Sequence, residues 1–489
     1  MYIFTSQKYN LGIGDVMKYE KVLRALAPII AGLIILAIPT PESLTFKAWC
    51  YFALFIAVIV ALITRPLPDA VVGLIGISLA AVFCLVEETP KASIKWALSG
   101  FANTTVWLIF AAFMFALGYS KTGLGRRIAL HLIRKLGRNT LGLGYAVALS
   151  DLVLAPFMPS NTARSAGTIY PIIRNIPEVY GSYPGETAGK IGTYIMWVAF
   201  ATTCVTSSMF LTSLAPNPLA AAIVAETVNI ELSWLDWVIG FLPVGIILFI
   251  LVPFITFKLA PPEIKRSDEI VKKAEEMLKE MGPIKRNEII FLGLVLFALV
   301  LWIGGRSFIH TTTVAVLIVV LMLLFKIISW DDILEYKQAW NVLVWFATLV
   351  TLASGLKEVG IIEWIANSVS ASLSGISPIL VIIIIFTVFY FMHYLFASIT
   401  AHTVAMLPVF LAVFLAIPDI PIKVATLMLC YSLGLFGILT PYATGPAPVY
   451  YGSGYIPPRK FWLLGLIYGL IFYFALLIIG LPYLLLIAS

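Results

Sequence analysis

Long apolar runs, each close to the length of one membrane crossing, recur along this chain and limit what it can fold into. Three lie near the N-terminus, at residues 23–38, 49–63 and 70–86. A helix needs about 20 apolar residues to cross the hydrocarbon core of a bilayer. Because 61% of the residues are hydrophobic and only 12% are charged, we predict an all-α polytopic membrane protein that contacts the lipid bilayer over most of its surface.

Further apolar runs follow at residues 105–119, 289–303, 311–328 and 461–487. Two polar segments between them differ in kind. Residues 126–138 carry five Lys or Arg side chains and one His among apolar residues, which indicates a basic helix along the cytoplasmic membrane interface. Residues 258–287 mix both signs of charge with apolar residues at helical spacing, which predicts an amphipathic linker helix between two membrane halves.

Two polar strings interrupt the apolar sequence at corresponding places in the two halves. They are PSNTARSAG at residues 159–167 and ASITAHTVA at residues 397–405. Each follows an apolar stretch punctuated by Gly, Pro, Asp or His, and each precedes a second break, at residues 213–220 and 439–448. Polar groups at membrane depth are costly and usually serve a function. We therefore predict two re-entrant hairpins whose tips line an aqueous cavity.

An internal repeat supports this interpretation. The Gly-rich lead-in at residues 105–125 is similar to residues 341–362, in which Gly355 and Gly360 have the spacing of Gly118 and Gly123. Repeats of this kind, with interrupted helices in matching positions, are typical of secondary transporters and mark their binding sites.

The strings are rich in hydroxyl and amide groups, which lie at Ser160, Asn161, Thr162, Ser398, Thr400 and Thr403. Together with the free amides of helix N-termini, such groups can hold carboxylate oxygens through fixed dipoles. Two facing tips suit a substrate with a carboxylate at each end. The pattern therefore favours a small dicarboxylate.

Dipoles alone compensate a dianion poorly in a low-dielectric site, so cations are expected nearby. Arg164 and His402 each follow a string threonine by two residues. The alternatives are that Arg164 is a snorkelling side chain at the interface and that His402 is a core histidine that donates to a backbone carbonyl. We expect His393, His310 and His131 to be structural.

The SNT and SITAH strings, the repeated lead-ins and the two Pro breaks resemble the divalent anion/sodium symporter (DASS) family, from about residue 105 to residue 455. The chain looks similar to the exchanger branch, which includes citrate/succinate and tartrate/succinate antiporters and plastid 2-oxoglutarate/malate translocators. The resemblance implies an α-helical homodimer with about eleven transmembrane helices and two re-entrant hairpins. It also implies a transport domain that moves as an elevator against a scaffold.

The resemblance places Ser160, Asn161 and Thr162 in the first substrate motif and Ser398, Ile399 and Thr400 in the second. Ile399 departs from the pattern, because sodium-coupled members have an asparagine there that helps bind ion and substrate. The second sodium site is therefore in doubt, and Arg164 and His402 become candidate replacements for the missing cations. The loops that complete the two sites in the family match Asn217, Ala443 and Thr444.

These residues predict sodium-independent antiport of di- or tricarboxylates of the succinate, malate, 2-oxoglutarate and citrate class. A carrier with built-in cations would return slowly when empty, because unpaired buried charge is costly. A sodium-coupled dicarboxylate symporter is the closest alternative, and an anion channel is another. We predict no enzyme activity, no cofactor and no metal site, since Asp151, the only acid of the first hairpin, is expected to cap a turn. The four cysteines have no metal-ligand spacing.

The repeats divide the chain into an N-terminal scaffold (residues 1–104), a first repeat (105–228), scaffold helices with the linker (229–340), a second repeat (341–458) and a C-terminal helix (459–489). The net charge of +7 is spread over juxtamembrane segments and fits membrane orientation, with no nucleic-acid partner. We expect the bacterial inner membrane, because the N-terminus does not resemble a plastid transit segment.

Overall fold

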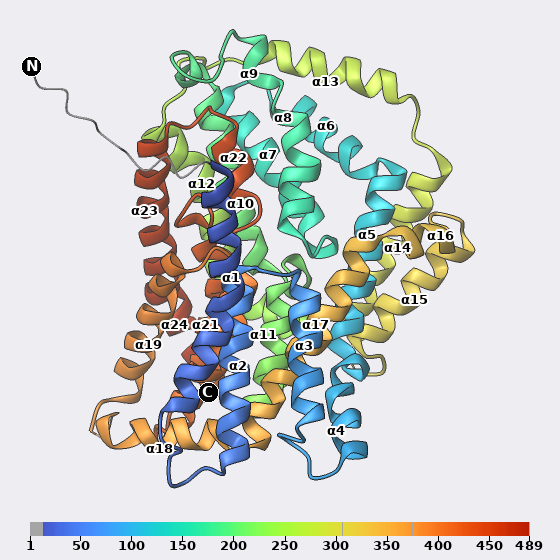
Figure 1. Cartoon of the computed structure of the whole chain (residues 1–489). Helices are drawn as coiled ribbons and strands as arrows, with labels where there is room; N and C mark the ends of the chain where they lie inside the picture. The colour runs from blue at the N-terminus through green and yellow to red at the C-terminus, as the bar shows by residue number, and fades with distance from the viewer. Residues whose placement is uncertain (1–12, 306, 374, 489) are drawn as a thin grey trace, which may run out of the picture.

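The chain is helical throughout the part that the structure describes, residues 13–305, 307–373 and 375–488 (Figure 1). In this computed structural model, the β structure of those residues is limited to an isolated bridge between Asn139 and Arg266. The first residues of the expected N-terminal scaffold (1–104) lie outside the described residues. The all-α class predicted from the apolar runs is confirmed.

The N-terminal apolar runs form α1 (Ile13–Ala37), α2 (Phe46–Thr64) and α3 (Asp69–Val82), followed by the short α4 (Pro90–Ala97). Helices α1 and α2 pack side by side, and α3 packs on α17 (Lys337–Glu358) of the second half. The contact with α17 is very close. A Cβ built at Gly73 would lie 1.9 Å from the Thr348 hydroxyl oxygen, so this contact requires glycine.

The first half of the chain continues as a series of helices that ends at residue 228. The series is α5 (Thr104–Thr122), α6 (Leu124–Leu136), α7 (Thr140–Leu154), the π-helix η3 (Thr162–Ile169), α8 (Tyr170–Ile173), α9 (Ile176–Val179), α10 (Gly192–Met209) and α11 (Pro216–Val228). Helix α10 is buried along its whole length. It packs against α7, α12 and α21, which places it at the centre of the molecule, beside the first polar string.

The remaining helices comprise the connecting segment and the second half. They are α12 (Trp234–Leu259), α13 (Asp268–Met281), α14 (Arg286–Gly304), α15 (Thr311–Leu324), α16 (Trp330–Glu335), α17, α18 (Ile361–Leu373), α19 (Pro378–Met392), α20 (Ile399–Leu415), α21 (Ile422–Leu435), α22 (Ala447–Gly452), α23 (Pro458–Ala475) and α24 (Leu481–Ala488). A short π-helical turn, Leu476–Gly480, joins α23 to α24.

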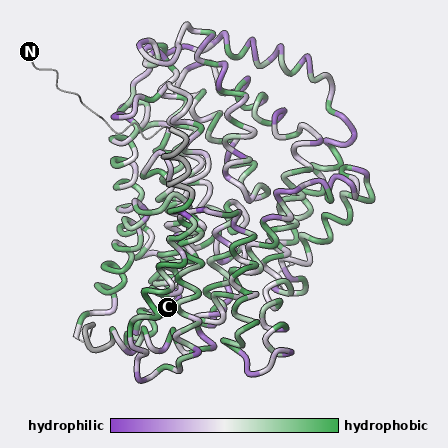
Figure 2. Tube along the Cα trace, in the orientation of Figure 1, coloured by the Kyte–Doolittle hydropathy of each residue, from purple (hydrophilic) through white to green (hydrophobic). Residues whose placement is uncertain are grey.

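Eight helices among the described residues are long and apolar enough to cross a membrane, and five more apolar helices are shorter. Figure 2 shows hydrophobic residues along most of the helices and a concentration of hydrophilic residues on α13. As predicted, α13 is amphipathic. It buries Ile270, Ala274 and Leu278 and packs on the basic helix α6, which buries Leu130 and Ile133.

Candidate substrate-binding site

The first polar string forms the turn between α7 and the π-helix η3. Pro156 and Pro159 cannot donate a backbone hydrogen bond, so α7 ends at Leu154 before them. The chain then restarts at Ser160, whose hydroxyl accepts from the amide of Ala163 at 3.2 Å. A π-helix has a different side-chain register from an α-helix and is often found at functional sites. The string thus forms the turn between two helices that pack as a hairpin.

The second break, residues 439–448, lies against the first string. Asn161 donates from its side-chain amide to the Thr444 hydroxyl at 2.8 Å. Four residues further along the string, the hydroxyls of Ser165 and Tyr450 are 2.8 Å apart. A Cβ built at Gly445 would lie 1.9 Å from the hydroxyl oxygen of Thr162, so the loop approaches this closely only with glycine there. The structure therefore brings the predicted residues Asn161, Thr162 and Thr444 together.

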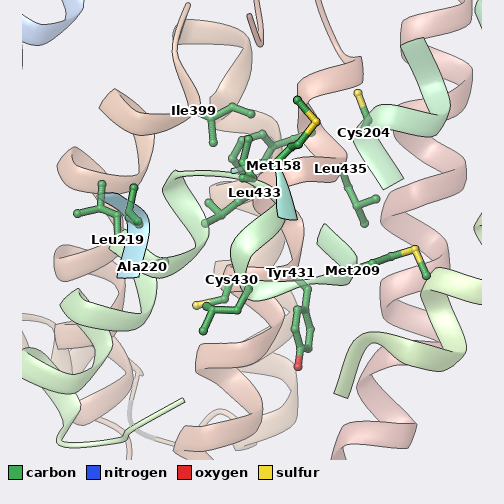
Figure 3. Close-up of a cluster of buried hydrophobic side chains, with 14 of the residues drawn as sticks. Met158, Cys204, Met209, Leu219, Ala220, Ile399, Cys430, Tyr431, Leu433 and Leu435 are labelled. Carbon is green, nitrogen blue, oxygen red and sulfur yellow. The ribbon is translucent and has the colours of Figure 1, made fainter. Parts of the chain in front are cut away.

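The second string starts α20, which packs against α11 immediately after the first break. Ser398 is the N-cap residue, and its hydroxyl accepts from the amide of Ala401 at 3.3 Å. Thr403 donates its hydroxyl to the Ile399 carbonyl at 2.8 Å, so this hydroxyl serves the helix. Thr400 is half-buried. The side chain of Ile399 belongs to a buried apolar cluster together with Met158 and Leu433 (Figure 3).

Arg164 lies inside the protein, with none of its side chain exposed. Its Nε donates to Asp151 Oδ2 at 3.1 Å. In total, the guanidinium donates to six oxygen atoms, which are Asp151 Oδ2, the Met158 and Ser213 carbonyls, and the hydroxyls of Thr203, Thr206 and Ser207. We call these six atoms the oxygen cage. The cage surrounds a charge that is fully ion-paired and hydrogen-bonded.

Two interpretations from the sequence are wrong here. Arg164 does not snorkel to the interface, because it is buried and bonded on all sides. Asp151 is not a turn cap, since it lies inside α7 and pairs with Arg164; it also accepts from the Thr206 hydroxyl. The sequence analysis missed Thr203, Thr206 and Ser207. Their spacing of three and four residues puts them on one face of α10, and hydroxyls on one face of an apolar helix were a usable signal.

His402 and His393 form a buried pair beside the second break. Their Nδ1 atoms are 3.0 Å apart, and His393 Nε2 lies 2.9 Å from the Ala443 carbonyl oxygen. The histidine that donates to a backbone carbonyl is therefore His393, and the alternative considered for His402 is wrong in that respect. His310 has a structural role, since its Nδ1 accepts from the Thr312 amide at the start of α15.

Asn217 anchors the first break. Its side-chain amide donates to the carbonyls of Ser207 at 2.7 Å and Phe210 at 3.0 Å. Its Oδ1 is buried and has no hydrogen-bond partner among the described residues. Asn217 thus ties the break to the end of α10, which contributes Ser207 to the oxygen cage, while the break itself contributes the carbonyl of Ser213.

Two cavities approach these segments from opposite ends of the helices. One of about 630 Å³ is lined by Met158, Gly167 and Thr168 of the first half and also by Arg126 and Lys285. The other, of about 490 Å³, reaches Leu211 and Ala221 beside the first break. Met277 and Met281 of α13 also line the 630 Å³ cavity, so it lies at the end of the molecule where α6 and α13 lie.

Metal-binding geometry is not found in the described ranges, which contain no group of three or more His, Cys, Asp or Glu side chains able to hold an ion. The four cysteines are free thiols. The hydroxyls and amides gathered at the two strings can donate hydrogen bonds to an anionic organic ligand.

Comparison with known proteins identifies the family. Residues 19–489 match the family described as the sodium:sulfate symporter transmembrane region. The chain belongs to the divalent anion/sodium symporter family. The L-tartrate/succinate antiporter of Shigella sonnei (strain Ss046) is 50% identical over 471 residues, which are 94% of this chain and 97% of that protein. The L-tartrate/succinate antiporter of Escherichia coli (strain K12) is 49% identical over the same coverage.

A solved structure extends the comparison to the fold. The Alcanivorax borkumensis YdaH transporter superposes with a TM-score of 0.54 at 13% identity, covering 78% of this chain and 86% of that chain. At this identity the likeness concerns the helical architecture alone. The resemblance of the sequence to the exchanger branch of the family is confirmed by the two antiporters, and the chain is a multi-pass transporter whose relatives support dicarboxylate antiport.

Proposed function

We propose that this protein exchanges C4 dicarboxylates across the bacterial inner membrane without sodium. The relatives from Shigella sonnei and Escherichia coli are named for L-tartrate and succinate, and we extend both substrates to this chain. Malate, another C4 dicarboxylate, and the larger 2-oxoglutarate and citrate are further candidates. The proposed binding residues are Ser160, Asn161, Thr162, Ser398, Thr400 and Thr444, with backbone amides at the start of α20.

The oxygen cage around Arg164 is the main observation that supports transport without sodium. A sodium ion in a protein is held by carboxylate, carbonyl and hydroxyl oxygens, and these are the groups that the guanidinium occupies. A tethered cation cannot dissociate with the substrate. At the second string, Ile399 offers a hydrocarbon side chain, 4% exposed, where an ion would need oxygen ligands. Both positions therefore oppose coupling to sodium.

Because Arg164 is ion-paired, its charge does not explain why an empty carrier should return slowly. Asp151 neutralises Arg164, so the empty site does not carry an uncompensated arginine. Among the described residues of the two strings, the buried polar atom without a hydrogen-bond partner is Nε2 of His402. Polar groups left unpaired in a low-dielectric site cost about 1–3 kcal/mol each. A cost of this size would slow the return of the empty carrier, since each 1.4 kcal/mol is about tenfold.

We further propose that the protein works as a homodimer and moves the two hairpins as a transport domain against α1–α3, α5 and α14–α15. The first string and the second break bond to each other directly through Asn161 and Thr444, which supports their moving as one unit. The end of the molecule that carries the basic helix α6 would lie in the cytoplasm. The 630 Å³ cavity at that end would then be the cytoplasmic approach to the first string.

The test is uptake of labelled succinate into proteoliposomes that contain either unlabelled succinate or buffer, with and without external sodium. We expect uptake only into preloaded vesicles, at a rate indifferent to sodium. Sodium-dependent uptake into empty vesicles would identify a symporter and overturn the proposal. Rapid uptake into empty vesicles that does not saturate would instead indicate the channel alternative.

A further inference from the structure

The His393–His402 pair links the second string, through the loop at Ala443 and Thr444, to the first string. His393 follows α19 and His402 lies in the first turn of α20, so the pair spans the second hairpin. Neither side chain has any exposed surface. The Ala443 carbonyl accepts from His393, and the next residue, Thr444, bonds Asn161 of the first string. The pair is therefore joined to the substrate segments of both halves.

The contact with the Ala443 carbonyl determines which ring nitrogens of the two histidines carry a hydrogen. A carbonyl oxygen only accepts, so His393 Nε2 must carry a hydrogen. In the neutral ring this leaves His393 Nδ1 as an acceptor. The 3.0 Å contact between the two Nδ1 atoms then requires the hydrogen on His402 Nδ1. In neutral His402, Nε2 is consequently a bare acceptor.

That acceptor has no partner. His402 Nε2 is buried and makes no hydrogen bond with any described residue. The faces of the ring are covered by aromatic side chains, with ring centroids 4.5 Å away for Phe389, 4.7 Å for Phe396 and 4.9 Å for Phe436. A buried acceptor without a donor costs free energy. Nε2 is also the one place where the pair can take another proton, because a second hydrogen between the Nδ1 atoms would break their contact.

His402 shares a helix face with Ser398, the N-cap residue of the second string. It follows Ser398 by four residues, so both side chains are on the same face of α20. Side chains of a helix lean toward its N-terminus, which directs the ring of His402 toward the string. His393 does not itself lie on the string; it acts on His402 through Nδ1 and on Thr444 through the neighbouring carbonyl.

We propose that the loaded carrier holds one proton between a carboxylate oxygen of the substrate and Nε2 of His402, with His393 as the positioning residue that directs the proton there. This inference rests on the proposed binding of dicarboxylates. The proton comes from solution when a dianion binds and returns to solution when it leaves. Because each substrate carries one proton in either direction, exchange of two dianions remains electroneutral.

The surroundings of His402 leave His393 as its one hydrogen-bonded titratable partner. The charged residues on the helices packed against α20 are Lys47, Glu226, Lys337, Lys357, Glu358, Glu363 and Lys423. None of them forms a hydrogen bond or ion pair with either histidine within the described structure. The linkage therefore concerns a single proton.

The sign of the pH dependence follows. Carboxyl groups ordinarily titrate near pH 4, so succinate is a dianion at pH 7 and above. The complex then contains one more proton than the free carrier plus the free dianion. Binding accordingly strengthens as pH falls and weakens as pH rises, by up to about tenfold per pH unit for one proton.

The experiment is calorimetric titration of the purified full-length protein with succinate at pH 7.5, in buffers that differ in ionisation enthalpy. The slope of the binding enthalpy against ionisation enthalpy counts the protons taken up. We expect about one proton per succinate for the unmodified chain. His131→Gln, which changes an exposed histidine on α6, should give the same number.

Three variants distinguish the hydrogen-bonding role of His393 and His402 from the packing of their rings. His402→Gln places a neutral amide near Nε2 and should bind succinate with no proton uptake and no pH slope. His393→Phe keeps the stacking on Phe436 but removes the acceptor for His402, so proton uptake should fall and binding should weaken. His393→Asn restores an acceptor near Nδ1 and should recover proton uptake.

Three results would overturn the inference. Succinate binding by the unmodified chain with no proton uptake would do so even if exchange persisted, and the exchange proposal would stand. Unchanged uptake in His402→Gln would place the proton elsewhere. Absence of any succinate binding or exchange in the unmodified chain would overturn the proposed function and this inference with it. The first measurement needs no variant, so a misfolded mutant does not weaken the test.

Discussion

Arg164 and Asp151 place two opposite charges in the core, where Arg164 is 0% and Asp151 is 2% exposed. A buried pair of this kind contributes little compared with an apolar core, yet removing one partner leaves an uncompensated charge. The hydroxyls of α10 and two carbonyls satisfy the remaining guanidinium donors. The pair is thus sensitive to single substitutions and tolerant of paired ones.

We expect Asp151→Asn to lower the free energy of unfolding by about 3–5 kcal/mol, because Arg164 loses its counter-charge. The double variant Asp151→Asn, Arg164→Gln should lose less than Asp151→Asn alone. Thermal unfolding of the detergent-purified protein measures both. Ser150→Ala is the matched control, since the Ser150 hydroxyl bonds the Ala146 carbonyl of its own helix. Equal losses in Asp151→Asn and Ser150→Ala would contradict the pairing.

We expect Gly445→Ala to abolish most exchange, because the new Cβ would lie 1.9 Å from the Thr162 hydroxyl and force the loop off the first string. Gly452→Ala is the control, since a Cβ there meets no atom within 4 Å. Exchange of labelled succinate in preloaded proteoliposomes is the measurement. Adding Thr162→Ala should restore the protein yield and thermal stability lost in Gly445→Ala; a failure to do so would exclude this clash as the cause.

At the residue scale, the sequence predicted the strings but not their bonds. Ser160, Asn161 and Ser398 could be proposed as site residues, because hydroxyl and amide side chains inside apolar runs are visible in the sequence alone. The pairing of Arg164 with Asp151, and of His402 with His393, depends on how each hairpin turns at its tip. Which side chains meet across a turn depends on the residue at which each helix ends, and the local sequence does not reveal that residue.

At the scale of helices, α16 is tied to the end of α5 by a contact outside the apolar core. Asp332 forms a capping box with Ser329 and accepts from Lys121 at 2.6 Å. The hydrogen bond from Lys121 is the largest of the effects that hold the pKa of Asp332 below its usual value. A carboxyl with a lowered pKa stabilises the fold above its unfolded-state pKa, and this stabilisation is lost as pH falls through the folded-state value.

We expect Asp332→Asn to lower stability at pH 7 by less than about 1 kcal/mol, because the pair is partly exposed and screened by solvent. The difference from the unmodified chain should shrink as pH is lowered through and below pH 4, where the aspartate itself is protonated. Thermal unfolding across that range is the measurement. A difference of constant size at every pH would assign the effect to the cap and not to the charge.

Helix positions were largely predictable, and helix type was not. The apolar runs at residues 49–63 and 289–303 correspond to α2 and α14, and the periodicity of residues 258–287 corresponds to α13. The π-helix η3 could not be predicted, since a shift from α to π register is decided by tertiary contacts of the string. The division into five domains and the count of eleven crossings remain predictions.

At the scale of the whole molecule, the charged helix α13 and the connection between α1 and α2 lie at opposite ends of the helices (Figure 1). Positive charge favours the cytoplasm for the end that carries α6 and α13. The proposed orientation would place the 630 Å³ cavity, which Arg126 and Lys285 help to line, on the cytoplasmic side.

We expect a cysteine at Lys272, exposed on α13, to react with a membrane-impermeant maleimide only after the cells are permeabilised. A cysteine at Glu42, exposed between α1 and α2, should react in intact cells. The unmodified chain, with Cys50, Cys84, Cys204 and Cys430, is the control for background labelling. The reverse pattern would invert the orientation and place the 630 Å³ cavity on the periplasmic side.

The bond between Asn161 and Thr444 has a consequence for biosynthesis, because 283 residues separate its two partners. The oxygen cage is complete once the ribosome has passed Ser213, but Thr162 and Asn161 meet their loop only after more than half of the remaining chain has entered the membrane. A nascent chain halted in between would display an unfinished polar tip inside lipid. Such an intermediate is the natural substrate of membrane chaperones and proteases, so truncations before residue 444 should be degraded and not accumulate as half-carriers.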